Sequence, residues 1–438
     1  MTEVDTANPQ PSRLTLRTVI ACNIGVCLEG FDFIAYSAFS FIIAKLFFPS
    51  TDPLISTLLA FGSLGVAYVV RPFAGLFWGI YADRYGRKLA LSWVSIIMAV
   101  GTAIIAFAPT YAAVGMAAPI IMLIARLIQG FSASGEFATA TAMLVELAPT
   151  RKRSFYASTQ MASQTVTIAL AVGVVLFLSE TLTPEALETW GWRLVFGIGT
   201  LIGPLGYYMR VRLVESPEFV AVSSKPGGVR KTPLRDAFRN HASSLLCMAG
   251  LIIIGSASFY LIIIFLPVYA ANELGIASRD AQIATIISAT IQCGIILLAG
   301  RLADKWGRGL VLLIASLIYA VAAYPLFSFL VANPSFEVLL AVQLAAAIVT
   351  GFISGPLPAA LSGLLPAEVR STGIGFMYNV VGAIFGGLGP FFITLLVSAT
   401  GDRAAPAYWA AFTGLIGAAA CIYLFQATRA RELKEFAA

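Results

Sequence analysis

Apolar stretches of twenty or more residues recur along the whole 438-residue chain, and this recurrence limits the fold more than any other feature. A helix needs about 20 residues, rising 1.5 Å each, to cross the roughly 30 Å of hydrocarbon in a bilayer. The stretches lack the period-two alternation of barrel strands. We therefore predict an all-α membrane protein with twelve transmembrane helices. The predicted helices cover residues 17–44, 54–80, 89–108, 119–146, 154–178, 191–212, 242–270, 280–300, 309–331, 337–364, 372–399 and 406–427.

Composition and charge placement agree with this class. Hydrophobic residues make up 59% of the chain and charged residues only 11%, against about a quarter charged in soluble domains. Most Lys and Arg residues fall on one side of the predicted membrane, and the loops of the other side hold only Lys45, Arg279 and Arg403. Because basic loops stay in the cytoplasm, we predict cytoplasmic N- and C-termini in a bacterial-type inner (plasma) membrane. The net charge of +6 then reflects topology and does not indicate a nucleic-acid partner.

The longest hydrophilic connection divides the helices into two groups of six with matching motifs. GIYADRYGRK follows the second predicted helix and GRLADKWGRG follows the eighth, while PTRKRSF follows the fourth and PAEVRST the tenth. Duplicated six-helix halves with a substrate site between them are typical of secondary transporters. The predicted domains are a cytoplasmic N-terminal tail (1–16), an N-terminal half (17–212), a cytoplasmic linker (213–241), a C-terminal half (242–427) and a cytoplasmic C-terminal tail (428–438).

The paired motif resembles the signature of the major facilitator superfamily, which implies two six-helix halves related by pseudo-two-fold symmetry. Its glycines allow a tight turn between helices, while Asp83 and Asp304 can accept from basic residues or a helix N-terminus across the contact between halves. Such a contact can hold one state of a transporter closed. Alternatively, the basic residues only fix the topology. The predicted gating residues are Gly79, Asp83, Arg84, Gly86, Arg87, Asp304, Gly307 and Arg308.

Two carboxylates interrupt the first apolar stretch, Glu29 and Asp32. A carboxylate at bilayer depth is costly unless it is protonated, paired or facing a water-filled cavity, so its default interpretation is functional. In the fourth predicted helix Arg126, Gln129 and Glu136 share a broad face, which we expect to face the cavity. Arg126 and Asp32 lie at matching depth and are predicted to pair. A carboxylate whose pKa responds to an arginine can couple proton binding to transport.

A second cluster is predicted from Arg71, Glu136 and Glu29, which lie slightly deeper toward the cytoplasm. A static buried ion pair that only fixes packing remains the alternative for each pair, since buried pairs add little net stability. The predicted proton-coupling residues are therefore Asp32, Glu29 and Glu136. The predicted substrate-binding residues are Arg126, Arg71, Gln129, Tyr36, Gln160, Gln164, Tyr260, Tyr378 and Asn379, although packing roles are an alternative for the amides and aromatic residues.

A finer resemblance rests on CLEGFD from residue 27, RPF from 71, RLIQG from 126, WGWR from 190 and ESP from 215. Together these segments resemble the metabolite:proton symporter family of the same superfamily, with citrate, tricarballylate and α-ketoglutarate carriers nearest. The resemblance implies a proton-coupled symporter that imports a small organic acid anion, such as citrate, by alternating access. The alternatives are a zwitterion such as betaine or proline, an aromatic or cyclic acid, export by proton antiport, and a channel or receptor.

Other function classes lack support. The five cysteines have no metal-ligand spacing, no phosphate-binding loop for ATP is present, and no constellation suggests an enzyme. We therefore expect no metal and no cofactor, with protons as the coupling ion. The expected partners are a small carboxylate substrate and the lipid bilayer, with no nucleic acid, and the protein is expected to be monomeric.

Overall fold

The computed structural model describes residues 14–49, 53–225 and 233–436, and over these ranges the chain forms helices and no strands. Parts of the predicted tails and linker, residues 1–13, 226–232 and 437–438, lie outside the described residues. Eleven helical segments of the described chain are long and apolar enough to cross a membrane. The remaining predicted span, 54–80, falls on the 33-residue helix Pro53–Tyr85. The all-α prediction is confirmed.

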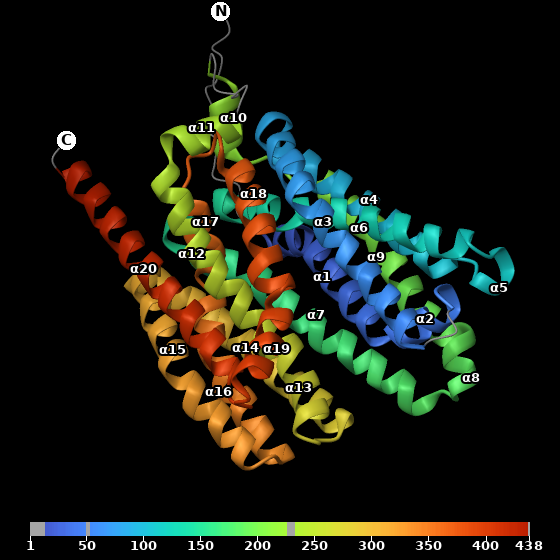
Figure 1. The fold of residues 1–438 in the computed structure, drawn as a ribbon. Helices are drawn as coiled ribbons and strands as arrows, with labels where there is room; N and C mark the ends of the chain where they lie inside the picture. Colours follow the sequence, from blue (N-terminus) through green and yellow to red (C-terminus); the bar gives the residue numbers. More distant parts are fainter. Residues whose placement is uncertain (1–13, 50–52, 226–232, 437–438) are drawn as a thin grey trace, which may run out of the picture.

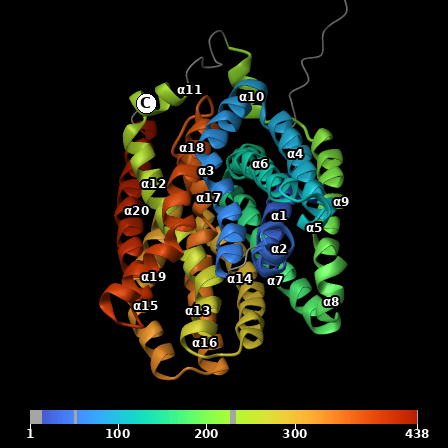
Figure 2. The same cartoon turned by 45° about the vertical axis from the view of Figure 1, so that its right-hand side comes forward.

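The N-terminal half is built from six long helical segments (Figure 1). Its elements are α1 (Leu16–Ala38), α2 (Ser40–Phe47), α3 (Pro53–Tyr85), α4 (Arg87–Phe107), α5 (Tyr111–Val114), α6 (Ala117–Leu147), η1 (Thr150–Lys152), α7 (Arg153–Thr181), α8 (Pro184–Ala186), η2 (Leu187–Gly191) and α9 (Trp192–Val211). The linker contains α10 (Pro217–Ser223) and α11 (Pro233–Asn240). We call the end of the molecule where α10 and α11 lie the linker end (Figures 1 and 2).

The C-terminal half repeats this plan. Its elements are α12 (Ala242–Phe259), η3 (Tyr260–Phe265), α13 (Leu266–Glu273), α14 (Ser278–Trp306), α15 (Arg308–Ala332), α16 (Phe336–Ser354), α17 (Leu357–Gly363), α18 (Arg370–Gly382), η4 (Ala383–Gly387), α19 (Gly389–Thr400) and α20 (Pro406–Phe436). The halves meet where α7 packs against α14 and α3 against α18. Figure 2 shows α3 running beside α18 along this contact.

Several spans predicted as continuous helices are interrupted. Prolines stand in the first turn of α13, α17 and α19, where the missing N–H does no harm but the preceding helical hydrogen bonds cannot continue. Just before α13 and α19 the chain passes through the wider π-helical turns η3 and η4. Such turns are rare and often occur at functional sites.

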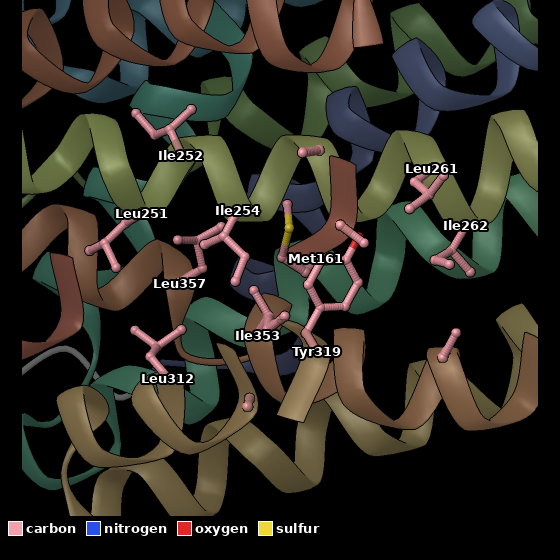
Figure 3. Packing of buried hydrophobic residues seen from close by; sticks show 14 of the residues in the cluster. Met161, Leu251, Ile252, Ile254, Leu261, Ile262, Leu312, Tyr319, Ile353 and Leu357 are labelled. Atoms are coloured by element: carbon pink, nitrogen blue, oxygen red, sulfur yellow. The ribbon is translucent and has the colours of Figure 1, made fainter. Parts of the chain in front are cut away.

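Apolar packing stabilises each half and continues across the contact between them. In the C-terminal half, buried side chains from α12, η3, α15, α16 and α17 form one large cluster. Phe137 and Ala138 of α6 and Met161 and Ala162 of α7 join it from the other half. Figure 3 shows Tyr319 and Ile353 within this cluster. Smaller clusters occupy the N-terminal half, one of them around Tyr36 and Trp192. Apolar contacts therefore also join the halves, and they would have to change when the halves move relative to each other.

Candidate functional site

A cavity lies between the two halves, with about 960 Å³ of empty space including the part open to solvent. Its walls come from α1, α3, α6 and α7 of one half and from α12, η3, α16, α17 and α18 of the other. Among the described residues that line it, Glu29 and Arg71 carry charge. The C-terminal half contributes hydroxyl, amide and aromatic groups. The predicted site residues that line this cavity are Glu29, Arg71, Gln164, Tyr260, Tyr378 and Asn379.

Glu29 and Arg71 form an ion pair in the cavity wall. Arg71 Nη2 donates to Glu29 Oε1 over 2.5 Å, and both side chains keep 17% of their surface exposed. The guanidinium also lies 4.6 Å from the ring centre of Tyr68, at a distance typical of cation–π contacts. The Tyr68 and Tyr260 hydroxyls are 2.6 Å apart, so a hydrogen bond joins this wall to the opposite half. Tyr68 was not among the predicted site residues, because a tyrosine in an apolar helix gives no signal that separates binding from packing.

Asp32 and Arg126 form the predicted pair, 2.9 Å apart and almost fully buried. Gln129 donates to Asp32 over 2.8 Å and accepts from Arg126 over 2.6 Å. The Arg126 guanidinium lies over the ring of Tyr36, 3.3 Å from its centre. The predicted contact is confirmed. The pair was expected to face the large cavity, but neither residue belongs to the described lining of that cavity.

A smaller cavity connects the two pairs. Glu29, Asp32, Arg71 and Arg126 all line it, together with Tyr68 and neighbouring residues. Gln129 belongs to the same lining. The N-terminal half therefore holds two acids and two arginines around one small space, beside the cavity between the halves.

The prediction that Glu136 faces the cavity is wrong. Glu136 pairs with Arg210 of α9, and both side chains are buried. Arg210 also donates to Ser95 Oγ and to the main-chain oxygens of Ala21 and Leu91. The Glu136–Arg210 pair is therefore bonded within the helix bundle and away from the cavity. Arg210 was missed because it stands at the end of a predicted helix, where a basic residue is expected to fix topology.

The predicted amide pair of α7 is also separated. Gln164 lines the large cavity, but Gln160 is fully buried, accepts from Thr141 over 2.7 Å and donates to the Phe137 main-chain oxygen over 3.1 Å. Gln160 therefore packs α7 against α6, although the two positions lie only about 40° apart around the helix. Asn379 lines the cavity and also donates to the Ser134 main-chain oxygen of the other half over 2.9 Å.

The predicted gating aspartates each accept from a helix N-terminus of the opposite half. Asp83 accepts from the main-chain N–H groups of Ser371 and Thr372 over 3.1 and 2.8 Å. Asp304 accepts from those of Ser154 and Phe155 over 2.8 and 2.9 Å. The N-terminus of a helix carries unpaired donors and partial positive charge. The expected contact across the halves is thus present twice at the linker end.

The arginines of the two motifs have different surroundings. Arg87 lies 3.3 Å from Asp83 and 3.2 Å from Glu146, and Glu146 also pairs with Arg370 of the other half over 2.6 Å. Arg308 donates to Ser154 Oγ and to the Ala359 main-chain oxygen, both over 2.9 Å. The duplicated motif predicted Arg87 and Arg308, whereas Glu146 and Arg370 lie outside it and were not predicted.

Glycines of both motifs allow close approach and sharp turns. Gly86 and Gly307 have φ of 102° and 92°, which side-chain-bearing residues rarely adopt. A Cβ on Gly79 would come within 2.6 Å of Thr372 Cα, so only glycine lets α3 and α18 meet there. Arg84 is exposed.

The linker reaches across both halves. Glu218 of α10 pairs with Arg153 over 2.6 Å and with Arg370 over 2.7 Å. Burial alone would raise the pKa of Glu218, but the two guanidinium groups outweigh it and hold the pKa below its ordinary value. Glu215 accepts from the main-chain N–H groups of Arg87 and Lys88 at the start of α4. The linker therefore takes part in closing the linker end. No group of His, Cys, Asp and Glu in the described ranges is placed to hold a metal ion.

Family models match both halves of the chain. The model described as "Sugar (and other) transporter" matches residues 18–232, and the one described as "Major Facilitator Superfamily" matches residues 248–437.

Similar proteins cover nearly the full length. A citrate-proton symporter of Klebsiella pneumoniae is 33% identical over 93% of this chain and 91% of its own. A proline/betaine transporter of Salmonella typhimurium is 30% identical over 92% of this chain and 81% of its own. Among solved structures, the proton:xylose symporter XylE bound to 6-bromo-6-deoxy-D-glucose has a TM-score of 0.75 at 18% identity, covering 95% of this chain and 96% of that one. This likeness supports the fold with two halves.

Proposed function

Because this chain belongs to the metabolite:proton symporter family of the major facilitator superfamily, we propose that it is a proton-coupled symporter that imports a small organic acid anion by alternating access. The substrate is a di- or tricarboxylate such as citrate. The linker end faces the cytoplasm of a bacterial-type cell, and the protein acts as a monomer without a cofactor.

The buried Asp32–Arg126 pair carries this proposal. A buried carboxylate and a buried arginine are stable only together, since removing one leaves an uncompensated charge. When a proton from outside neutralises Asp32, Arg126 becomes available to a substrate carboxylate, which it can bind through two parallel hydrogen bonds. Release of the substrate on the other side lets Asp32 lose its proton and recapture Arg126.

The closed linker end fits the same cycle. Asp83, Asp304 and Glu218 join the halves there, while the cavity between the halves retains open space. Substrate binding from outside and breakage of these contacts would expose the cavity to the cytoplasm.

A zwitterion such as betaine or proline is the second candidate substrate. The Salmonella typhimurium relative is named for these compounds, and the cavity is lined by aromatic rings such as Phe259 and Tyr378 beside the ion pair of Glu29. Aromatic faces attract cationic ligands.

Reconstitution into proteoliposomes with an imposed pH gradient tests the function. We expect labelled citrate to accumulate, with α-ketoglutarate and proline as competitors that separate the two substrate classes. Asp32→Asn leaves Arg126 permanently released, so it should abolish accumulation but keep citrate exchange. The matched control is Glu188→Gln, which removes a carboxylate from an exposed pair with Lys45 and should leave uptake intact. Normal gradient-driven accumulation by Asp32→Asn would remove Asp32 from the coupling mechanism.

A further inference from the structure

The two ion pairs share the smaller cavity, and their arginines keep donors without partners. Arg126 Nε and Nη2 and Arg71 Nε are buried, and none has a hydrogen-bond partner among the described residues. Arg126 as a residue is 3% exposed. A buried N–H without a partner costs free energy, and a carboxylate is the ligand that fits a guanidinium edge. The space therefore holds two potential carboxylate-binding groups, each now occupied by an acid of the protein.

Glu29 controls the charge that a substrate meets on entering. With Glu29 ionised, the charges of Arg71 and Glu29 cancel in the wall of the large cavity. A second carboxylate placed beside ionised Glu29 would be repelled by its like charge. Protonation of Glu29 removes this repulsion and frees Arg71 at the same time. Binding of an anion at Arg71 is thus linked to binding of a proton at Glu29.

The other groups around Glu29 do not replace it as the proton acceptor. Arg71 and Tyr68 approach from α3, Asp32 from its own helix, and Arg126 from α6, all in the smaller cavity. Glu136 of α6 is nearby but is paired with Arg210. Tyr260 and Tyr378 face the site from the other half and Gln164 from α7. Of the carboxylates, Glu29 is the one that lines both cavities.

We propose that Glu29 is a second proton-binding residue, separate from Asp32, and that Arg71 and Arg126 bind two carboxylates of one substrate. Each proton joins an oxygen of its acid, the corresponding ion pair breaks, and a substrate carboxylate takes the released guanidinium. On release, each acid gives up its proton and recaptures its arginine. This inference rests on the proposed function. It limits the favoured substrate to an acid with at least two carboxylates, bound together with two protons.

The test measures how many protons the purified full-length protein binds for each citrate bound. Isothermal titration calorimetry in buffers of different ionisation enthalpy gives this number. The ionisation of citrate itself contributes equally to every variant and cancels in the comparison. We expect Glu29→Gln and Asp32→Asn each to bind about one proton fewer than the unmodified protein, and the double variant about two fewer. For each unit by which the pH rises, the citrate affinity of the unmodified protein should fall about tenfold more than that of Glu29→Gln.

Each outcome decides the proposal. An unchanged proton number in Glu29→Gln would show that Glu29 is a static partner of Arg71 and would overturn it. If Glu29→Gln does not fold, Arg71→Gln asks the same question: without its guanidinium partner the buried Glu29 would already hold its proton before citrate binds, so the number must again fall by one. Glu188→Gln should match the unmodified protein. Accumulation of proline but not citrate would overturn the two-carboxylate site while leaving a proton-coupled transporter, whereas absence of all gradient-driven uptake would overturn the proposed function itself.

Discussion

The two copies of the gating motif close the linker end through the same backbone contact, but their arginines have different partners. In both, an aspartate at the end of one helix accepts from two main-chain N–H groups at the start of a helix in the other half. The equivalent arginines Arg153 and Arg370, each the first residue of such a helix, both pair with Glu218 of the linker. This shared part follows the duplication and shows that the backbone contact is the repeated unit.

The difference lies around the motif arginines. Glu146 joins Arg87 to Arg370 across the halves, and all three side chains are buried. In the register that aligns Pro149 with Pro366, the position equivalent to Glu146 is Gly363. Arg308 therefore meets the neutral oxygens of Ser154 and Ala359. The duplicated sequence motif is symmetric, whereas the buried carboxylate that joins two arginines across the halves, Glu146, has a glycine at the equivalent position.

Loss of Glu146 should break the stronger gate and give the largest effect. Glu146→Gln leaves Arg87 and Arg370 without their shared buried carboxylate, and breaking a buried ion pair costs about 3–5 kcal/mol. We expect the population open at the linker end to rise more than tenfold and the melting temperature to fall. Spin labels at the exposed positions Lys152 and Lys305, one in each half, measure this opening by their separation. An unchanged label distance together with an unchanged melting temperature would mean that the Glu146 carboxylate does not stabilise the closed linker end.

The two aspartates compare the copies directly, with a smaller effect. Asp83→Asn and Asp304→Asn each remove a charge from a helix N-terminus, a change of about 0.3–2 kcal/mol. Asp83 also lies 3.3 Å from Arg87, so its variant should open the linker end several-fold more than the Asp304 variant. The same label pair reports both variants. Equal opening would indicate that the backbone contacts alone determine closure.

The smallest expected effect comes from building the missing carboxylate. A Cβ on Gly363 would lie 3.1 Å from Arg308 Nη1, the end of a flexible side chain. Gly363→Glu should pair with Arg308 and stabilise closure by up to about 1 kcal/mol, the range of exposed pairs, so that citrate uptake slows a few-fold. Gly363→Gln is the matched control without the charge. Faster uptake in the Glu variant than in the Gln variant would show that a carboxylate beside Arg308 does not stabilise the closed linker end.

Much of the fold was predictable from local features. Apolar length predicted the helices, and the repeated motif predicted two halves with aspartates that meet helix N-termini. The interruptions within the predicted spans were not predicted, because a proline permits either a kinked helix or the start of a new helix, and packing decides between them. Depth along a helix also predicted the Asp32–Arg126 pair, since two helices of known direction leave few partners at one level.

What the sequence determined by itself is therefore the membrane class, the duplication and the identity of the charged residues at bilayer depth. The tertiary structure decided how those charges combine. Sequence placed Glu136 with Glu29 and Arg71, but the packing of α9 brings Arg210 to Glu136 and leaves Glu29 with Arg71 at the cavity. Position along a helix fixes the depth of a side chain, whereas its partner depends on which neighbouring helix its face meets, and only the packed bundle settles that.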